Sequence, residues 1–521
     1  MNRYLALFLL ASSASAVTVQ FDPLNPQTGP FPADSLTVPD TTQITGKHVN
    51  LPLPDCNAQP GLCSMLALEN QQDGFNVQPR ITASFSGPID TSTLQTGIFF
   101  VALDNLTSDE AGLEKPGDTV AINQIAWDPA SNTAYAKPDA AMDQHRRYLL
   151  VVTDAVHDAG GNPVTPDPAF TACLQTSDTT GYCPDLSRAV AQLIPGANKI
   201  VAASLFTTLS ATAWVQSARR QLQYMPVVTH HPDGQYVFNF STLSNLAVNF
   251  DTGSGNFTGF SLPLNSPTYS LLFGGLGRIA FGSYLSPLVL NSQLTIDPSP
   301  TGAEVALPTP LNEINFHVYL PNTPPPSNGY PVVIFGHGFG DSSIGAPTVV
   351  APALANAGFA TIAINAFGHG FGPQSNLVLT DSSGNSTTIP LGGRGVNLAG
   401  QGMIGPTDGC VILSPVPVGL RDCLRQTVVD LLQLVRVIQG GLDLDGDGVP
   451  DLDGTRIYYV GQSYGAIYGT VLNAVEPGIR AAVLNVGGGS VADIERWSPG
   501  FSDTAAATLT SQNPPLLPAG T

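Results

Sequence analysis

The residues best suited to chemistry are a serine and its two flanking glycines, in the segment Gly461-Gln462-Ser463-Tyr464-Gly465. The apolar run 456–460 precedes this segment, and a helix-forming run, 466–477, follows it. Such an order is required of a nucleophile elbow, a sharp strand-to-helix turn that projects a serine hydroxyl above a sheet. The turn strains the serine backbone, and only small residues two positions before and after it let strand and helix approach closely. Ser463 is therefore the candidate nucleophile; the alternative is a glycine-rich turn with an idle serine.

An acyl-transfer serine also requires donors that stabilise the negative charge developing on the substrate oxygen. The first predicted donor is the backbone N–H of Tyr464, at the amino end of a helix. The second is expected from the loop after an earlier strand, and residues 337–341 directly follow the apolar run 331–336. We assign it to the backbone N–H of Phe339, with Gly338 as the competing choice.

Two histidines lie in loops after predicted strands. His337 opens the loop that carries Phe339, and His369 follows the next apolar run, 359–367. Either imidazole has the chemistry of a general base. A histidine in such a position more often braces its loop through hydrogen bonds, so we expect both to be structural.

The acid and base that such a serine needs are expected after it in the chain, on loops that follow later strands. One strand-like run, 479–486, and no histidine follow Ser463. Asp493, just beyond that run, is the one possible acid position, although the acid more often follows the next strand. Without a base the serine hydroxyl stays protonated. The sequence therefore predicts a C-terminally truncated chain, short by on the order of 100 residues, with little or no turnover.

An acidic loop precedes the elbow strand. Its pattern, D-x-D-x-D-G, opens calcium loops of the EF type, in which oxygen ligands alternate along the chain and a glycine permits a sharp turn. Glycine stands where the EF-hand has its bidentate glutamate, so the loop is closer to the dockerin or thrombospondin type 3 pattern. Close carboxylates repel one another unless a cation neutralises them, which favours structural Ca²⁺ over a solvated acidic loop. The predicted ligands are the side chains of Asp443, Asp445, Asp447 and Asp451 and the carbonyl of Val449.

The elements that position these residues follow from apolar periodicity. Continuous apolar runs are typical of strands buried on both faces of a parallel sheet, and here they alternate with helix-forming runs, which predicts right-handed crossovers and a doubly wound sheet. The expected strands are 312–321, 331–336, 359–367, 456–460 and 479–486, and the expected helices are 346–358, 420–441 and 466–477.

The amino-terminal part has another pattern. Between about 79 and 210, short β-type runs alternate with turns, which predicts a β-sandwich. We divide the chain into an N-terminal region, 17–222, a connecting region, 223–310, that cannot be assigned, and a sheet-and-helix domain, 311–521. A length of 521 residues supports more than one domain.

Composition limits the possible partners. Charged residues are 11% of the chain, acids outnumber bases 39 to 19, and the net charge of −20 argues against nucleic acid or an anionic membrane surface as partner.

Residues 1–16 read as a signal peptide, with an apolar run far shorter than the roughly 20 residues of a membrane span. We therefore expect secretion. Six cysteines in three close pairs, 56 with 63, 173 with 183 and 410 with 423, predict local disulfides rather than zinc, while six cysteines permit about 15 connectivities.

With its HGFG loop, long helix, DLDGDGVPDLDG loop and GQSYG elbow, the chain resembles the secreted α/β-hydrolases grouped with the bacterial virulence factor lipases. Its segment 79–164 resembles the bacterial Ig-like modules found ahead of secreted enzymes. The resemblance implies a multidomain protein, an Ig-like β-sandwich followed by an α/β-hydrolase with a mostly parallel sheet that lacks its last strands. It also implies a Ser-Asp-His triad, of which this chain carries the serine, and lipid or lysophospholipid esters as substrates.

The leading function is therefore a secreted serine carboxylic-ester hydrolase that needs no organic cofactor and forms an acyl-enzyme on Ser463. Polyester depolymerases, acyltransferases and peptidases use the same machinery. A different class is a non-catalytic surface or adhesion protein with a degenerate hydrolase domain. The missing histidine favours that class, whereas the intact elbow and oxyanion loop oppose it. Oligomeric state and acyl-chain preference do not follow from the sequence.

Overall fold

The computed structural model describes residues 16–107, 114–193, 199–230, 236–308, 311–397, 400, 402–410, 418–511 and 515. The predicted signal peptide lies outside these residues, except for Ala16. The chain forms two compact units. The N-terminal unit contains the residues up to Asp55, Leu62–Ala211 and Pro300–Ala303, and the C-terminal unit contains Cys56–Gly61, Thr212–Ser299 and the residues from Glu304 onward.

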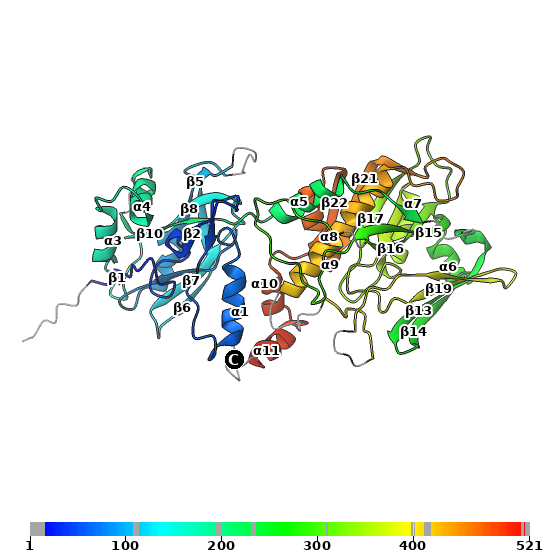
Figure 1. The fold of residues 1–521 in the computed structure, drawn as a ribbon. Coiled ribbons are helices and arrows are strands. Elements are labelled where there is room, and N and C mark those ends of the chain that lie inside the picture. Colours follow the sequence, from blue (N-terminus) through cyan, green and yellow to red (C-terminus); the bar gives the residue numbers. More distant parts are fainter. Residues whose placement is uncertain are drawn as a thin grey trace, which may run out of the picture. The chain divides into compact units, whose positions relative to one another are not determined.

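Figure 1 shows the elements in sequence colours. Up to residue 211 they are β1 (Thr18–Val19), η1 (Asp34–Leu36), β2 (Thr37–Pro39), β3 (Lys47–Val49), α1 (Pro60–Glu69), β4 (Ile81–Ser84), η2 (Thr91–Thr93), α2 (Leu94–Gly97), β5 (Ile98–Asn105), β6 (Thr119–Asp128), β7 (Thr133–Pro138), β8 (Arg146–Thr153), β9 (Thr165–Pro166), α3 (Pro168–Leu174), α4 (Tyr182–Ala191) and β10 (Ile200–Thr207).

The N-terminal unit is built on antiparallel strands in the order β10-β8-β5-β6-β7-β4. Strand β6 pairs with β5 through Thr119–Ala121 and with β7 from Ile122 onward, with a register shift between Asn123 and Ala126. Side chains from β4 and β7 and side chains from β5, β8 and β10 fill one shared core. Two layers that face a single core make a β-sandwich, as the short alternating runs predict.

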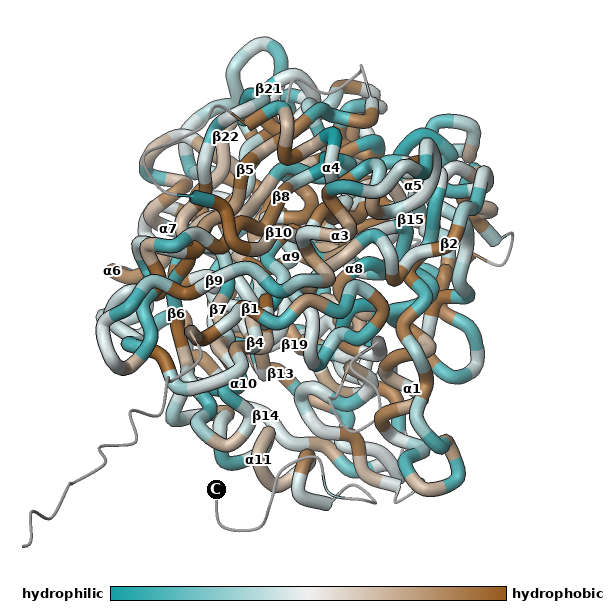
Figure 2. The backbone as a smooth tube through the Cα atoms, turned by 90° about the vertical axis from the view of Figure 1, so that its left-hand side faces the viewer, coloured by the Kyte–Doolittle hydropathy of each residue, from teal (hydrophilic) through white to brown (hydrophobic). Residues whose placement is uncertain are grey.

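Alternation along the strands builds a second core on the outer face. In β8, Tyr148 and Leu150 point into the sandwich, whereas Leu149 and Val151 contact side chains of α3 and α4. All four side chains are buried, so β8 reads as continuously apolar rather than half polar. Figure 2 shows the same property as hydrophobic, brown stretches of the tube at β5 and β8. The disulfide between Cys173 and Cys183 joins α3 to α4.

The second half of the chain has more helix. Its elements are α5 (Ala213–Leu222), β11 (Thr229–His230), β12 (Val237–Asn239), η3 (Phe240–Thr242), β13 (Leu243–Gly253), β14 (Asn256–Pro263), α6 (Pro267–Leu272), β15 (Leu276–Pro287), β16 (Leu311–Pro321), β17 (Tyr330–Gly336), α7 (Ala346–Asn356), β18 (Ala360–Ile364), β19 (Asn376–Asp381), β20 (Ser386–Pro390), α8 (Val418–Gln439), β21 (Leu452–Gln462), α9 (Tyr464–Val475), β22 (Ile479–Asn485), α10 (Val491–Trp497) and α11 (Ser502–Thr510).

The central sheet of the C-terminal unit has the order β11-β15-β16-β18-β17-β21-β22, with β12 also paired to β15. Strands β18, β17, β21 and β22 are parallel neighbours. Strand β16 runs antiparallel to both β15 and β18. The expectation of a mostly parallel sheet is therefore wrong: the sheet is mixed, because β11, β12, β15 and β16 join by antiparallel pairing.

Helices cover both faces of this sheet. Side chains of α5, α8 and α9 pack with one face in the largest core, and α7 contributes Ala351 and Ala355 to a core on the other face. A smaller sheet, β14-β13-β19-β20, adds Leu246, Val248 and Leu377 to the α7 side. Among the described helices, none has the length and hydrophobicity that a membrane span requires.

The stretch 223–310, left unassigned from the sequence, belongs mainly to the C-terminal unit. It supplies β15, whose alternate side chains Ala280 and Tyr284 enter the main core. Helix α5, which we expected in the N-terminal region, also packs there through Val215 and Leu222. The amphipathic face of α5 is buried against helices α8 and α9, with both of which it makes contact.

Candidate active site

Ser463 lies at the turn between β21 and α9, with backbone angles φ 53° and ψ −115°. A positive φ in a residue with a side chain is sterically strained and persists only where neighbouring contacts hold it. Two hydrogen bonds do so here. The Ser463 N–H donates to the Asn485 carbonyl at 2.9 Å, and the Ser463 carbonyl accepts the N–H of Ala466 at 2.8 Å. The turn thus has the strain and the strand-to-helix setting of a nucleophile elbow.

The glycines on either side of the serine are required by close packing. A Cβ on Gly465 would lie 2.0 Å from the carbonyl oxygen of Gly336, and a Cβ on Gly461 would lie 2.4 Å from that of Gly465. The Tyr459 hydroxyl fixes the same contact, because it donates a hydrogen bond to the Gly465 carbonyl at 2.6 Å. The start of helix α9 therefore packs against the ends of β17 and β21 with the backbones in direct contact.

The loop predicted to hold the second oxyanion donor lies beside the serine. A Cβ on Gly338 would be 3.6 Å from the Cβ of Ser463. The ring of Phe339 packs edge to face on Tyr464 at 5.8 Å. Within the part of the chain that the structure describes, the backbone N–H groups of Phe339 and Tyr464 donate no hydrogen bond. Both amides are therefore available to a ligand at Ser463.

His337 is fully buried beneath this loop. Its Nδ1–H donates to the Gly338 carbonyl at 2.9 Å, and its Nε2 accepts the N–H of Ala366 at 3.0 Å. Burial lowers its pKa to about 4. An imidazole that uses both nitrogens on backbone groups holds the loop in place and has no site left for a serine proton.

The ring of His369 stacks on the Tyr464 ring at 5.0 Å, and it also lies 5.5 Å from the rings of His337 and Phe339. Its Nδ1 is bonded to the Phe367 carbonyl at 3.1 Å, while its Nε2 is buried without a hydrogen-bond partner among the described groups. Burial, and then the nearby His337, lower the pKa of His369 to about 3. His369 is not among the side chains that line the cavity at Ser463.

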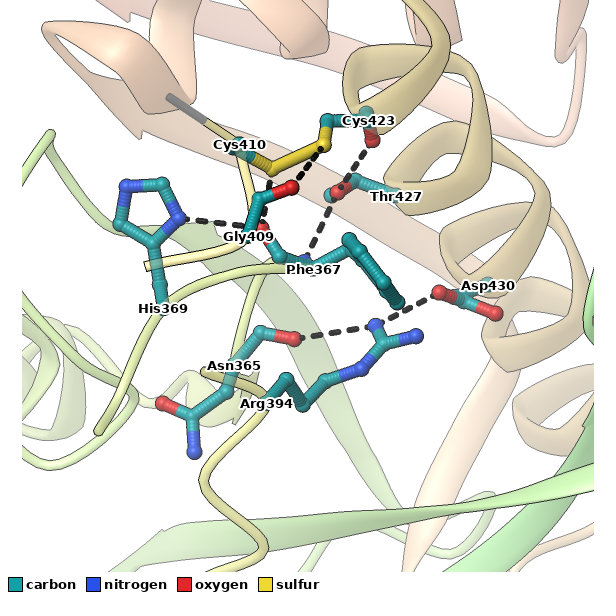
Figure 3. Close-up of a disulfide and its surroundings, with 9 residues drawn as sticks. All are labelled: Asn365, Phe367, His369, Arg394, Gly409, Cys410, Cys423, Thr427 and Asp430. Atoms are coloured by element: carbon teal, nitrogen blue, oxygen red, sulfur yellow. Dashed lines mark hydrogen bonds and ion pairs between the residues drawn. A yellow bond between two sulfur atoms is a disulfide. The ribbon is translucent and has the colours of Figure 1, made fainter. Parts of the chain in front are cut away.

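Figure 3 shows how the loop of His369 is attached to α8. The Thr427 hydroxyl accepts the N–H of Phe367 at 3.0 Å, and the Cys410–Cys423 disulfide joins the segment beside this loop to the same helix. Deeper in, the Arg394 guanidinium pairs with the fully buried Asp430 carboxylate at 2.6 Å. The segments around the His369 loop are therefore held to α8 by a disulfide, an ion pair and a hydrogen bond. The remaining cysteines, Cys56 and Cys63, are also disulfide-bonded.

A cavity of about 260 Å³ opens beside Ser463. Its walls are almost entirely apolar, and Glu495 is the one charged residue among them. The lining residues are Phe339, Leu420, Ser463, Tyr464, Ile467, Val486, Gly487, Gly488, Val491, Ile494, Glu495 and Phe501.

A larger cavity, of about 660 Å³, lies at the other edge of the sheet, since Tyr330, the first residue of β17, lines it. Ser463 follows the carboxyl end of β21. Ligands of open α/β sheets bind outside the carboxyl ends of the strands. The smaller cavity is therefore the candidate active site.

The structure distinguishes two acids of α10. Asp493, the predicted catalytic acid, is in the first helical turn and does not line the cavity. Glu495, two residues later, does line it, and burial raises its pKa. Sequence reasoning missed Glu495 because no helix was expected after β22. Helical spacing of Val491, Ile494 and Glu495 was the available signal.

The predicted calcium loop brings three of its acids together. Carboxylate oxygens of Asp443, Asp445 and Asp447 lie within 4.8 Å of one another. Arg278 binds two of the predicted ligands, with Asp445 at 2.9 Å and Asp451 at 3.3 Å. The second Asp451 oxygen accepts the N–H of Leu444 at 2.8 Å. The oxygen donors suit Ca²⁺, but Arg278 already neutralises part of their charge.

Two features define an α/β-hydrolase-like unit. The first is the strand order β15-β16-β18-β17-β21-β22, in which β16 alone of the six strands runs antiparallel to the others. The second is the strained serine after β21. The family model described as a bacterial Ig-like domain matches residues 60–172, nearly all of which lie in the N-terminal unit, so this unit contains an Ig-like domain. No curated protein sequence matches the chain.

The solved structures that match the chain include esterases. Acetyl xylan esterase 1 from Thermoanaerobacterium sp. JW/SL YS485 is 15% identical, with a TM-score of 0.27, over 56% of this chain and 64% of that one. An acetyl xylan esterase from Paenibacillus sp. R4 is 13% identical, with a TM-score of 0.31, over 58% and 69%. The match to the first spans less than two thirds of its length. TM-scores this low carry no argument, so the assignment of the fold rests on strand order and the elbow.

Proposed function

We propose that this protein is a serine carboxylic-ester hydrolase. Ser463 Oγ attacks the ester carbonyl carbon, and the backbone N–H groups of Tyr464 and Phe339, with Gly338 as the alternative to Phe339, bind the resulting oxyanion. The C–O bond to the alcohol breaks, and the alkoxide leaves as the alcohol, carrying the proton that the Ser463 hydroxyl loses on attack. Water then hydrolyses the acyl-enzyme and releases the acid.

The observation that carries this proposal is the strained backbone of Ser463 at the mouth of an apolar cavity. A serine in an ordinary turn gains nothing from a positive φ, and strain of this kind collects at functional sites. The amides of Phe339 and Tyr464 beside it supply the second requirement of acyl transfer, donors not committed to other described groups.

The proposal assigns the general base to neither neighbouring histidine. His337 uses both ring nitrogens on backbone groups, and His369 does not reach the cavity. The role of Asp493 as the acid stays a prediction. The apolar walls favour esters with an apolar group. The lipid esters that the sequence resemblance implies stay a prediction.

We further propose that residues 1–16 direct export and that Asp443, Asp445, Asp447, Asp451 and the Val449 carbonyl hold a structural Ca²⁺. Arg278 supplies part of the neutralisation in its absence. Export through the leader predicts that the protein recovered outside a bacterial host begins at Val17, which N-terminal sequencing determines.

Fluorophosphonate labelling tests the hydrolase proposal. The reagent phosphonylates activated serines, so we expect covalent modification of Ser463, located by peptide mass spectrometry, and none in Ser463→Ala. Ser498→Ala, which changes a partly buried serine just beyond α10, is the matched control and should label normally. Folded protein that shows no modification would contradict the proposal and favour a non-catalytic binding protein.

A further inference from the structure

One wall of the cavity at Ser463 is a single face of α10. Val491, Ile494 and Glu495 are spaced three and four residues apart, so they share one side of the helix. The Ser490 hydroxyl caps the helix by accepting the N–H of Asp493 at 3.4 Å. Gly488 allows the helix to approach, because a Cβ there would lie 2.3 Å from the Ile494 side chain. This packing sets α10 over the serine.

The size of the cavity limits what can enter it. A cavity of about 150 Å³ lined by apolar side chains holds a benzene ring. At about 260 Å³, the cavity beside Ser463 accommodates a short aliphatic chain or one ring, and a long acyl chain would have to extend beyond it.

Glu495 gives this apolar cavity a charge. Burial is the one cause that raises its pKa, and among the described residues none forms an ion pair or hydrogen bond with it. The nearest basic residue in sequence, Arg496, instead lies over the Trp497 ring at 4.7 Å. A carboxylate partly removed from water without a partner is unfavourable, and a ligand that supplies a cation or a donor relieves that cost.

We propose that the cavity selects a short apolar group whose end carries a positive charge or a hydrogen-bond donor, and that Glu495 excludes anionic groups. The inference rests on the proposed function for its meaning as substrate selection. The ester substrates admitted are those with a short, cationic or neutral donor-bearing group next to the scissile bond. Hemiesters of dicarboxylic acids are rejected.

The test measures binding without turnover. Ser463→Ala protein is titrated at pH 8, where the carboxylate is ionised, with n-hexylammonium chloride, hexan-1-ol and sodium hexanoate, and Kd is obtained by ligand-observed NMR. The three probes share a six-carbon tail and differ in the charge of the head. We expect hexylammonium to bind about tenfold more tightly than hexanoate, with hexanol between them.

Two variants separate the pocket from general electrostatics, which matter in a chain of net charge −20. Glu495→Gln should bring the Kd values of hexylammonium and hexanoate within about threefold of each other, whereas Asp503→Asn, which removes one exposed charge from α11 outside the cavity, should keep the difference. Ile494→Trp should weaken all three probes by filling the cavity.

Equal binding of hexylammonium and hexanoate, or a preference that survives Glu495→Gln, would overturn the proposal. So would binding that Ile494→Trp leaves unchanged, because the probes would then be elsewhere. None of these results depends on the serine. Failure of fluorophosphonate labelling, by contrast, would remove the hydrolase function and leave the selectivity of the cavity as measured.

Discussion

At the scale of single residues, the site depends on glycines, which have no Cβ. Gly461 and Gly465 let backbone segments meet, and Gly336 leaves room for the Tyr459 side chain; a Cβ at any of the three would overlap an oxygen atom. The strain at Ser463 is held by this packing and by the hydrogen bond to Asn485. A single added methyl group should therefore affect the chemistry before it affects the rest of the fold.

Gly465→Ala tests this dependence. The new Cβ would lie 2.0 Å from the Gly336 carbonyl oxygen, so α9 must shift away from β17. We expect loss of fluorophosphonate labelling and a free energy of unfolding lower by about 1–3 kcal/mol, measured by urea denaturation. Gly419→Ala is the control, since a Cβ at that position of α8 meets nothing within 4 Å. It should label normally and be slightly more stable, by up to about 1 kcal/mol.

Buried histidines make the α/β-hydrolase-like unit sensitive to acid. Burial lowers the pKa of both His317 and His337 to about 4, whereas an exposed histidine in the unfolded chain titrates near 6.5. The folded state therefore binds these protons less tightly. Their contribution to stability is present above pH 6.5 and is lost as the pH falls towards 4, by up to about 3 kcal/mol for each residue.

We expect the urea midpoint of this unit to fall steadily between pH 6.5 and 4.5. His317→Phe removes one of the two titrations and should make the midpoint less dependent on pH over that range, although the substitution itself costs some stability at pH 7.5. A pH dependence identical to that of the unchanged protein would show that His317 is not responsible.

At the scale of elements, helix α8 joins the sheet to the loop beneath Tyr464. Its buried face carries Gln426 and Asp430 among apolar side chains, and the Asp430 carboxylate accepts hydrogen bonds from Ser286, Gln426 and Arg394. A charge this deeply buried is tolerated because these donors surround it. Burial nevertheless raises the pKa of Asp430, and Arg394 opposes that shift.

Arg394→Met should expose the cost of that charge. The Asp430 carboxylate keeps two neutral donors but loses its cation, so we expect the free energy of unfolding to fall by about 3–5 kcal/mol in chemical denaturation. The double variant Arg394→Met/Asp430→Leu removes both charges and should recover at least half of the loss. Equal stability of the single and double variants would mean that the pair contributes by packing alone.

The acidic loop before β21 gives a prediction for the metal. If the proposed Ca²⁺ binds, calcium should raise the unfolding temperature by several degrees at saturating concentration, measured by differential scanning fluorimetry against EDTA. Arg278 competes for Asp445 and Asp451, so Arg278→Gln should lower the calcium concentration needed. Asp443→Asn should raise it. No calcium-dependent shift in any of the three proteins would contradict the proposed site.

Much of the element level follows from sequence periodicity. The apolar runs that predicted β16, β17, β18, β21 and β22 all form strands of the central sheet. Strand β15 escaped prediction because Gly277, Gly282 and its polar residues interrupt the run, although antiparallel pairing with β16 along its whole length holds it in the sheet. Long-range pairing of this kind leaves no local pattern.

The candidate site, too, could be predicted from the sequence only in part. Ser463, Tyr464 and Phe339 were predicted as one site because the elbow and its loop are local motifs, and the structure places the three side by side. Glu495 was not found, since its importance depends on how a short helix after β22 packs over the serine. The ion pair between Arg394 and Asp430 joins a loop residue to a helix residue, and the sequence of neither segment predicts its partner.

At the scale of the whole molecule, each unit has its own cores. One set of buried side chains lies between the strands of the Ig-like domain, and another surrounds the mixed sheet. Units with separate cores commonly unfold as separate cooperative transitions. Calorimetry at pH 7.5 should therefore show two transitions.

Acid should separate these transitions further. The strongly depressed histidine pKa values, those of His317, His337 and His369, all belong to the α/β-hydrolase-like unit. We expect the transition of this unit to move to lower temperature between pH 6.5 and 4.5 more than that of the Ig-like domain. Equal movement of both transitions would mean that paired carboxylates, present in both units, dominate the acid response.

Helix α10 has one more property of consequence: none of its seven residues is fully buried. Changes at Val491 or Ile494 therefore alter the wall of the cavity with little effect on the scaffold, whereas the glycines under Ser463 allow no such freedom. Reactivity and selectivity are thus governed by parts of the chain with very different tolerance to mutation. New preferences can evolve, or be selected in the laboratory, by successive single substitutions in this helix while the reactive turn stays as it is.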